Sequence, residues 1–158
     1  EDALGRFRAA ADARGITLKS VGESGIVVAG DRRQITSALG NLIDNAVKYS
    51  PDGATVTVSA RENPSGLALS VADTGDGIPS RDLDRVFERF YRVDRARSRE
   101  TGGTGLGLAI VRHVAHNHGG EVSVRSKEGQ GSEFTLVLPL GTDVVEPESP
   151  VDDSEVSA

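Results

Sequence analysis

Residues 34–50 read QITSALGNLIDNAVKYS, and their pattern predicts a long amphipathic helix. Its apolar side chains follow the i, i+3, i+4, i+7 spacing of one buried helical face: Ile35, Ala38, Leu39, Leu42, Ile43, Ala46 and Val47. Asp31 precedes the pattern and is a suitable N-cap. The turn residues Pro51-Asp52-Gly53 end it. We therefore expect this helix to pack its apolar face on the rest of the domain.

A second stripe on the same helix is polar. Asn41, Asp44, Asn45 and Lys48 lie roughly opposite the apolar face, at ~100° per residue. One interpretation is a solvated outer face, but such faces favour Glu, Lys, Gln and Ala, and Asn is a poor helix former. Side-chain oxygens suit Mg²⁺, which shares its coordination shell with substrate phosphates. A lysine suits the phosphate itself. We therefore interpret the stripe as a ligand-binding surface.

Length and composition bound the possible functions. A chain of 158 residues fits one domain with its own core. A net charge of -6 argues against a nucleic-acid groove and against contact with an anionic membrane. The lack of Cys excludes disulfides, thiol catalysis and Cys-ligated zinc. No apolar run approaches the ~18–20 residues of a membrane span. Since the chain opens on charged, helix-like residues and has no Met, we expect it to be a piece of a longer protein.

The N-terminal part is expected to hold one helix and two short strands. Apolar spacing predicts a helix over Asp2–Arg14, with Gly15 as its C-cap. Strand candidates follow at Ile16–Ser20 and Ile26–Ala29, around a turn at 22–25.

Two hairpins define the predicted fold class. Alternating apolar residues pair Ala54–Arg61 with Leu67–Ala72, and Glu121–Arg125 with Ser132–Leu138. Because the strands come in hairpins rather than βαβ units, we expect an α+β two-layer sandwich. One mixed, mainly antiparallel sheet would carry the helices on a single face.

The region between the hairpins is less regular. We expect a short helix over Arg81–Phe87, capped by Ser80, and a further helix over Leu106–His116. The polar stretch between them is expected to be a mobile loop, disordered over Arg95–Gly103. Residues 141–158 are rich in acidic residues, Ser and Pro, and we expect a disordered tail after a domain that spans 1–140.

Two glycine clusters carry candidate chemistry. Asp73-Thr-Gly75-Asp-Gly77 follows a predicted strand, so a carboxylate there could accept a hydrogen bond from the exocyclic amine of adenine; a plain glycine turn with an Asx cap is the alternative. The second cluster, at 102–108, runs into a helix N-terminus, whose free N–H groups favour phosphate. Neither is specific alone, and the second lacks the Lys-Ser/Thr ending of a Walker loop.

Four motifs in this order resemble the catalytic, ATP-binding domain of bacterial sensor histidine kinases. They are NxxxNAxKY at 41–49, DxGxGI at 73–78, FxxFYR at 87–92 and GTGLGL at 103–108. That family has a Bergerat-type nucleotide fold, which it shares with DNA gyrase, a mismatch-repair ATPase and a heat-shock chaperone. The resemblance covers roughly residues 1–140 and looks closest to actinobacterial kinases of the phosphate-limitation-sensing kind.

The resemblance implies ATP and Mg²⁺ as cofactors and gives the helix residues their roles. Asn45 is similar to the Mg²⁺ ligand, and Asn41 lines the same site one turn earlier. Lys48 is expected to contact phosphate, and Tyr49 to cover the adenine plane.

The other three motifs complete the expected site. Asp73 is similar to the carboxylate that accepts from the adenine amine, in a pocket shaped by Gly75, Gly77 and Ile78. Phe87 and Phe90 match the ring pair at the base of the ATP lid, although core packing alone also explains them. Residues expected to reach the phosphates are Arg92, Gly103, Thr104, Gly105, Leu106 and Gly107.

One position separates a kinase from a hydrolase. The gyrase-like ATPases have a water-activating glutamate four residues before the Mg²⁺ asparagine, and here that position is Asn41, which cannot act as a general base. Asp44 has the wrong spacing. The sequence therefore favours a domain that holds ATP for transfer.

The three histidines do not resemble the acceptor of that family. His113, His116 and His118 follow the second glycine cluster without the flanking residues of a phosphoacceptor, so surface and capping roles are expected. His113 and His116 could share a helix face as metal ligands, but no third ligand is apparent. The acceptor histidine is expected on a separate dimerisation domain.

The resulting hypothesis is a histidine kinase catalytic domain. It would deliver the γ-phosphoryl of Mg-ATP to the dimerisation and phosphoacceptor domain, for relay to a response regulator. The expected location is the cytoplasm, with the parent protein anchored in the plasma membrane. The alternatives are a nucleotide-dependent switch module and a gyrase-like ATPase of the same fold.

Overall fold

The structure is a computed structural model that describes residues 2–93 and 104–140. The expected loop at 95–103 and the expected tail at 141–158 lie outside these residues. Within them, the chain forms one sheet with helices packed against it.

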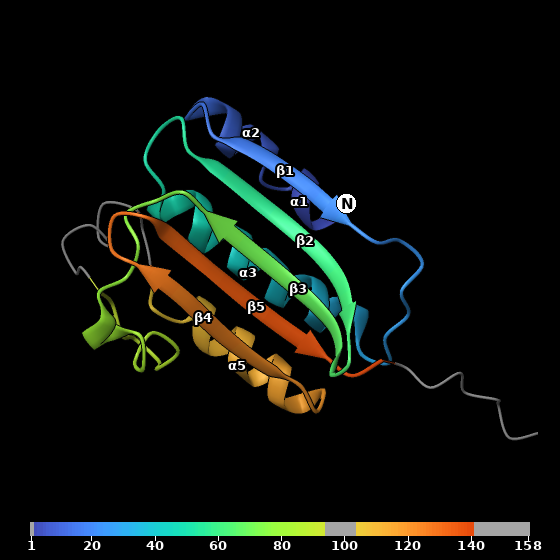
Figure 1. The fold of residues 1–158 in the computed structure, drawn as a ribbon. Helices are drawn as coiled ribbons and strands as arrows, with labels where there is room; N and C mark the ends of the chain where they lie inside the picture. Colours follow the sequence, from blue (N-terminus) through green and yellow to red (C-terminus); the bar gives the residue numbers. More distant parts are fainter. Residues whose placement is uncertain (1, 94–103, 141–158) are drawn as a thin grey trace, which may run out of the picture.

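The sheet has five strands in the order β1-β2-β3-β5-β4 (Figure 1). β1 is parallel to β2, and every other pair of neighbours is antiparallel. Both predicted hairpins, β2–β3 and β4–β5, are present, and the two lie side by side because β3 pairs with β5. The strands are β1 (Thr17–Gly22), β2 (Thr55–Asn63), β3 (Gly66–Asp73), β4 (Glu121–Lys127) and β5 (Gly131–Leu138).

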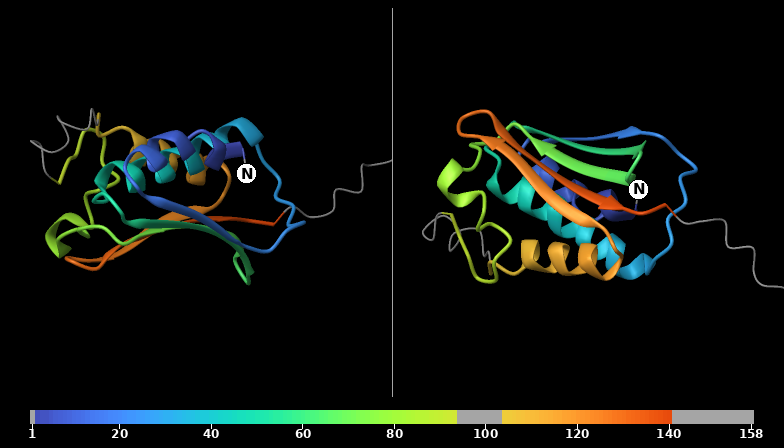
Figure 2. Two further views of the ribbon diagram at one scale, coloured as in Figure 1. Left: turned by 90° about the horizontal axis from the view of Figure 1, so that it is seen from above. Right: turned by 60° about the horizontal axis from the view of Figure 1, so that its bottom comes forward.

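The helices cover one face of the sheet, as the left view of Figure 2 shows with the sheet edge-on. They are α1 (Asp2–Gly5), α2 (Arg8–Ala13), α3 (Arg32–Tyr49) and α5 (Gly107–Asn117). Leu42 and Ile43 of α3 are fully buried in a core that includes Val56, Val71 and Leu136 of the sheet. The apolar stripe of α3 thus faces the sheet, and the predicted two-layer α+β sandwich is confirmed.

The predicted N-terminal helix is interrupted. Asp2–Arg14 forms two short helices, because the chain turns between α1 and α2 with a hydrogen bond from Phe7 N–H to the Leu4 carbonyl. Gly5 is a weak helix former at this point, and the turn lets Phe7 pack against the core. Gly15 ends α2 in the left-handed region, with a φ of 64°, as expected.

Two other predicted elements are wrong. Ile26–Ala29 is not a strand: Val28 makes a single bridge to Leu140, and β1 takes β2 as its neighbour instead. Arg81–Phe87 is not an α-helix: a 3₁₀ turn covers Ser80–Asp82, and further three-residue turns follow. Here burial of Val86 and Asp82 decides the local conformation over helix propensity.

His118 joins the end of α5 to the start of α3. Its Nδ1 lies 2.7 Å from the carbonyl oxygen of Val114, and its Nε2 accepts from the Asp31 N–H at 3.0 Å. The Nδ1–H tautomer satisfies both bonds. Asp31 in turn caps α3, as predicted, by accepting from the N–H groups of Arg33 and Gln34. The capping role expected of His118 is therefore present, and it fixes the two helices that will flank the site.

We predict that Gly30 and His118 are energetically coupled. A Cβ on Gly30 would lie 2.5 Å from the His118 ring, so Gly30→Ala should cost about 1–3 kcal/mol of unfolding free energy. His118→Ala should cost about 0.5–1.5 kcal/mol through the lost hydrogen bonds. In the double variant, the cost of Gly30→Ala should be smaller, because of the three atoms nearest to the added Cβ only the flexible end of Ile35, at 2.9 Å, then remains. Urea unfolding measures all four proteins.

His116→Ala serves as the control, because His116 is exposed in the last turn of the same helix. Simple additivity of Gly30→Ala and His118→Ala would show that the ring is not what fills the space beside Gly30.

Candidate functional site

A cavity of about 530 Å³ opens at the end of the sheet where β3 ends. Its lining residues come mainly from the C-terminal half of α3, the N-terminus of α5 and the segment that follows β3. Figure 1 shows these three parts of the chain together at the left. Motifs that are far apart in the sequence meet here, because the C-terminal ends of β3 and α3 and the N-terminal end of α5 all lie at this edge of the sheet.

The polar stripe of α3 forms one wall of the cavity. Asn41, Asp44, Asn45 and Lys48 all line it, as does Tyr49 at the end of the helix. The Lys48 Nζ lies 2.9 Å from Asp44 Oδ2, one turn earlier. The wall therefore presents half-buried amide groups and an ion pair.

Asp73 lies at the C-terminal end of β3 and lines the cavity. Its Oδ1 accepts from the Gly75 N–H at 2.9 Å. Burial raises the pKa of the Asp73 carboxyl, and hydrogen bonds from the Gly75 and Ser132 backbones oppose that rise. These two donors leave further lone pairs on the carboxylate, so Asp73 can still accept a hydrogen bond from a ligand.

The loop after Asp73 is fixed to the β4–β5 hairpin. The Ile78 N–H donates to Ser126 Oγ at 2.7 Å, and that hydroxyl contacts Ser132 Oγ at 2.8 Å. The Gly129 N–H donates to the Asp76 carbonyl oxygen at 2.7 Å. Gly77 and Ile78 therefore line the cavity from a backbone that is held in place.

The N-terminus of α5 forms the opposite wall. Thr104, Gly105, Leu106 and Gly107 line the cavity there. An added Cβ on Gly107 would lie 3.8 Å from the Asn41 side chain, so the start of α5 approaches the polar stripe closely. Leu106 is the N-cap residue, and its apolar side chain does not accept a hydrogen bond from the first turn of α5. Backbone N–H groups of this first turn are suited to an anion.

The backbones of Phe90 and Gly105 are in contact at the rim of the cavity. The Phe90 N–H donates to the Gly105 carbonyl oxygen at 2.9 Å, and both residues have positive φ, 64° and 73°. Phe90 is 70% exposed, whereas Phe87 packs edge-on against Phe134 with ring centroids 5.9 Å apart. Of the predicted ring pair, Phe87 therefore packs against the core and Phe90 projects outward.

The buried carboxyl of Asp82 holds Tyr91, the residue that follows Phe90 at the rim of the cavity. Tyr91 OH donates a hydrogen bond to Asp82 Oδ1, and this bond raises the pKa of Tyr91. The Arg85 guanidinium lies 4.5 Å from the Tyr91 ring centroid and pairs with Glu88 at 3.2 Å. Tyr91 and Arg92 both line the cavity as a result.

Most of the predicted site residues therefore meet at one cavity. Gly75 and Phe90 are not among its lining residues, and Gly103 lies outside the described part of the chain. The predicted residues that line it are Asn41, Asn45, Lys48, Tyr49, Asp73, Gly77, Ile78, Arg92, Thr104, Gly105, Leu106 and Gly107.

Several lining residues were not predicted from the sequence. Ser132 and Phe134 come from β5, where Ser132 is the register partner of Asp73 and Phe134 that of Val71. Val86 and Tyr91 come from the irregular segment. Tyr91 lies within the third motif, so its place beside Arg92 was a usable signal. The β5 residues depend on strand pairing, which the sequence motifs do not show.

The histidines of α5 do not line the cavity. Within residues 2–93 and 104–140, no cluster of three or more His, Cys, Asp or Glu side chains is arranged to hold a metal. His113 Nε2 lies 3.2 Å from Asn117 Nδ2, one turn later. Among the helices described, none has the length and apolar character needed to cross a bilayer.

Comparison with known proteins identifies the family. The histidine kinase-, DNA gyrase B- and HSP90-like ATPase family matches residues 30–142. The sensor-like histidine kinase SenX3 of Mycolicibacterium smegmatis is 47% identical over 154 residues, which cover 98% of this chain and 39% of SenX3. The sensor histidine kinase WalK of Bacillus subtilis is 46% identical over 124 residues, 77% of this chain and 20% of WalK. The chain thus spans at most about two fifths of these relatives.

Solved structures agree with the sequence relatives. A mycobacterial sensor histidine kinase, MprB, superposes with a TM-score of 0.76 at 34% identity, over 88% of this chain and 91% of that one. Full-length ShkA in complex with AMPPNP superposes with a TM-score of 0.77 at 31% identity, over 89% of this chain and 29% of that one. The chain therefore belongs to the histidine kinase-, DNA gyrase B- and HSP90-like ATPases, as a catalytic ATPase domain homologous to those of sensor histidine kinases.

Proposed function

We propose that the domain binds Mg-ATP in the cavity beside β3 and delivers the γ-phosphoryl group to a histidine on a separate dimerisation and phosphoacceptor domain. From that histidine the group would pass to a response regulator. The observation that carries the proposal is the meeting of the α3 stripe, Asp73 and the start of α5 at one cavity. We further propose that the domain works in the cytoplasm and that its parent protein is anchored in the plasma membrane.

The residues at the cavity fit a magnesium-bound nucleotide. Asn41 and Asn45 provide amide oxygens of the kind that hard cations accept. The start of α5, where an added Cβ on Gly107 would lie 3.8 Å from the Asn41 side chain, provides backbone donors for phosphate. Asp73, which also lines the cavity, provides an acceptor for an exocyclic amine. ShkA, whose structure has the same fold, is a complex with AMPPNP, which supports an ATP site in this domain.

Each wall of the cavity has its own task in this proposal. Asn45, with Asn41 beside it, would hold Mg²⁺, which supplies charge neutralisation at the phosphates. Lys48 would exchange its ion pair with Asp44 for a phosphate contact, and Arg92 would reach the terminal phosphates from the rim. Tyr49 would cover the adenine plane. The domain therefore contributes positioning and charge, which is most of what phosphoryl transfer requires of a protein.

Asn41 supports transfer over hydrolysis. It lines the cavity one turn before Asn45, where a water-activating base would need to be. An amide takes no proton at neutral pH, so this side chain cannot activate a water molecule. The isolated domain should bind ATP and turn it over slowly.

Titration calorimetry with AMPPNP tests the site directly. Wild type should bind, and should prefer AMPPNP to its guanine counterpart. Asp73→Asn should lose about tenfold or more in affinity, because the new amide group donates where the adenine amine also donates. Asn45→Ala should lose the Mg²⁺ dependence of binding, because it removes the metal ligand.

Matched controls for this titration are Asp52→Asn, at a residue whose side chain is 80% exposed, and Asn117→Ala, at the far end of α5. Both should bind as wild type does. Equal affinity of wild type and Asp73→Asn would place the nucleotide elsewhere.

The raised pKa of Asp73 predicts a pH-dependent stability cost. Because burial raises this pKa above 3.8, the folded protein keeps a proton that the unfolded chain has already lost. Between 3.8 and the raised value, the contribution of Asp73 to the free energy of unfolding should fall as pH rises, and Asp73→Asn should lack that contribution. Thermal unfolding without nucleotide, from about pH 4 to pH 7, should show the Tm of Asp73→Asn gaining on wild type as pH rises. A gap that moves the other way would contradict the desolvated state of the carboxyl.

The contact between Gly105 and Phe90 predicts a site-specific glycine requirement. Gly105→Ala would place a Cβ 2.7 Å from the Phe90 Cα, in addition to the strain of a positive φ. We expect it to lower AMPPNP affinity about tenfold by displacing the start of α5.

Gly25→Ala is the matched control for Gly105→Ala. Gly25 has a similar φ, 79°, but nothing lies near its added Cβ among the described residues. Both variants should therefore lose comparable stability from backbone strain, of about 1 kcal/mol, while Gly25→Ala keeps normal affinity. Equal affinity losses in the two variants would mean that strain alone, and not the Phe90 contact, is responsible.

A further inference from the structure

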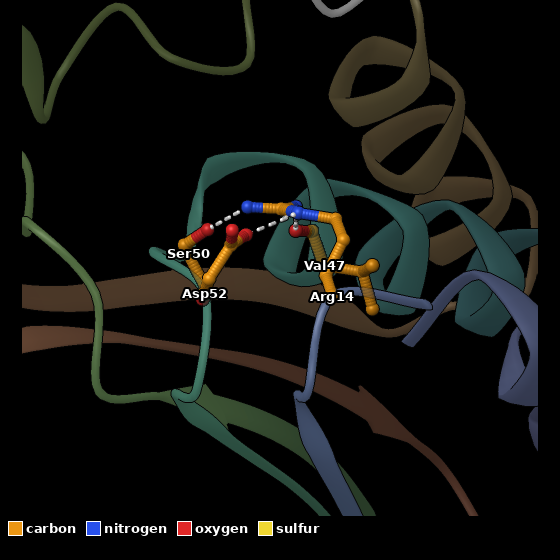
Figure 3. Close-up of polar contacts among 4 residues, drawn as sticks. All are labelled: Arg14, Val47, Ser50 and Asp52. Atoms are coloured by element: carbon orange, nitrogen blue, oxygen red, sulfur yellow. Dashed lines mark hydrogen bonds and ion pairs between the residues drawn. The ribbon is translucent and has the colours of Figure 1, made fainter. Parts of the chain in front are cut away.

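Arg14 reaches from the end of α2 to the end of α3 (Figure 3). Its guanidinium donates to the carbonyl oxygen of Val47 and, at 2.5 Å, to that of Ser50. Its Nε lies 3.0 Å from Asp52 Oδ1. Arg14, Val47, Ser50 and Asp52 are all absent from the described lining of the cavity. The arginine therefore acts on the end of α3 from outside the nucleotide site.

This contact caps the C-terminus of the helix that carries the polar stripe. The last carbonyls of a helix lack partners within the helix, and they form the negative end of its dipole. A planar guanidinium can donate to two of them at once, which an ammonium group cannot do with the same geometry. The Arg14 side chain is only 33% exposed, whereas that of Asp52 is 80% exposed. The two carbonyl bonds, rather than the ion pair, therefore define this cap.

The backbone around Arg14 is fixed to the same place. The Gly53 N–H donates to the Arg14 carbonyl oxygen at 3.1 Å, and the Thr17 N–H donates to the Ala54 carbonyl oxygen at 2.9 Å. These bonds hold the α2–β1 junction against the turn between α3 and β2. The guanidinium thus starts from a defined position, so that its direction toward Val47 and Ser50 is set.

The capped turn holds two of the proposed nucleotide contacts. Lys48 and Tyr49 lie between the two carbonyls that Arg14 binds, and both line the cavity. The end of this turn also packs against the loop after β3. A Cβ on Gly75 would lie 3.2 Å from the Tyr49 carbonyl oxygen and 2.8 Å from Asp73 Oδ1. A shift of the turn would therefore be transmitted to the Gly75 N–H and to the Asp73 carboxylate that accepts from it.

We propose that Arg14 is a positioning residue of the nucleotide site. By capping the last turn of α3, it holds Tyr49 and the Asp73–Gly75 loop in the arrangement that accepts the adenine end of the nucleotide. This inference rests on the proposed function, since it names a residue that supports the same cavity from behind. It predicts that a side chain with no ligand contact sets adenine-nucleotide affinity.

Four variants test the proposal by AMPPNP titration. Arg14→Ala removes the cap and should lower affinity about tenfold. Arg14→Lys keeps the charge but not the two-carbonyl geometry, and should lower affinity about threefold. Asp52→Asn leaves both carbonyl bonds in place and should stay within about twofold of wild type. Arg61→Ala makes the same charge change as Arg14→Ala on an exposed residue near the far end of β2, and should bind normally.

Amide hydrogen exchange separates positioning from a general loss of stability. The Gly75 N–H and the Ser65 N–H each donate to the side chain two residues earlier at 2.9 Å, but Ser65 lies in the turn at the opposite end of the sheet. In Arg14→Ala and Arg14→Lys without nucleotide, exchange at Gly75 should accelerate and exchange at Ser65 should not. A merely structural role would leave the two amides unchanged or accelerate both alike.

The outcomes are distinct for the proposed function and for this inference. If wild type binds no AMPPNP, the proposed function fails, and the exchange of Gly75 still shows whether the cap fixes the loop. If wild type binds and both Arg14 variants bind equally well, the inference is overturned while the proposed function stands. Lower affinity with parallel acceleration at Gly75 and Ser65 also overturns it. Lower affinity with acceleration at Gly75 alone supports it.

Discussion

The structure depends on the packing of α3 against the sheet. Leu42 and Ile43 are fully buried against strand residues such as Val56 and Leu136, and this contact leaves the helix no freedom to rotate. A helix with one face fixed has its other faces fixed as well. The direction of Asn41, Asn45 and Lys48 toward the cavity is therefore a consequence of hydrophobic burial a few ångströms away.

Two features of the site, the buried carboxyl of Asp73 and the positive φ of Phe90, are energetically unfavourable in the folded state. Burial disfavours the charged form of Asp73, and backbone donors from Gly75 and Ser132 compensate only in part. Phe90 keeps a positive φ against Gly105 at the rim. Such features persist where surrounding structure determines them, and here the supports are the β4–β5 hairpin, the buried Asp82 and the arginine cap on α3. Asp82 and Arg14 lie outside the cavity lining, whereas the β4–β5 hairpin also contributes Ser132 and Phe134 to it.

Sequence patterns succeeded where one local signal dominated. The apolar spacing of 34–50 predicted α3 and its buried face, and alternating residues predicted both hairpins. They failed where tertiary contacts outweigh propensity. Gly5 and the packing of Phe7 divide the N-terminal helix, and the burial of Asp82 and Val86 replaces a predicted helix with turns. The predicted strand around Val28 is reduced to a single bridge, because β1 pairs with β2 instead.

Helix and strand periodicity and side-chain chemistry are local properties, so the sequence alone predicted α3, α5, both hairpins, the four motifs and the chemistry that their residue types allow. Which residues share one cavity depends instead on the tertiary packing. Ser132 and Phe134 join it through the register of β5 on β3, whereas Gly75 and the exposed Phe90 are not among its lining residues. The arginine cap on α3 also depends on tertiary structure. Arg14 and Ser50 are 36 residues apart and meet because β1 pairs with β2. Contacts between distant residues follow from the packing of whole elements, which no local pattern encodes.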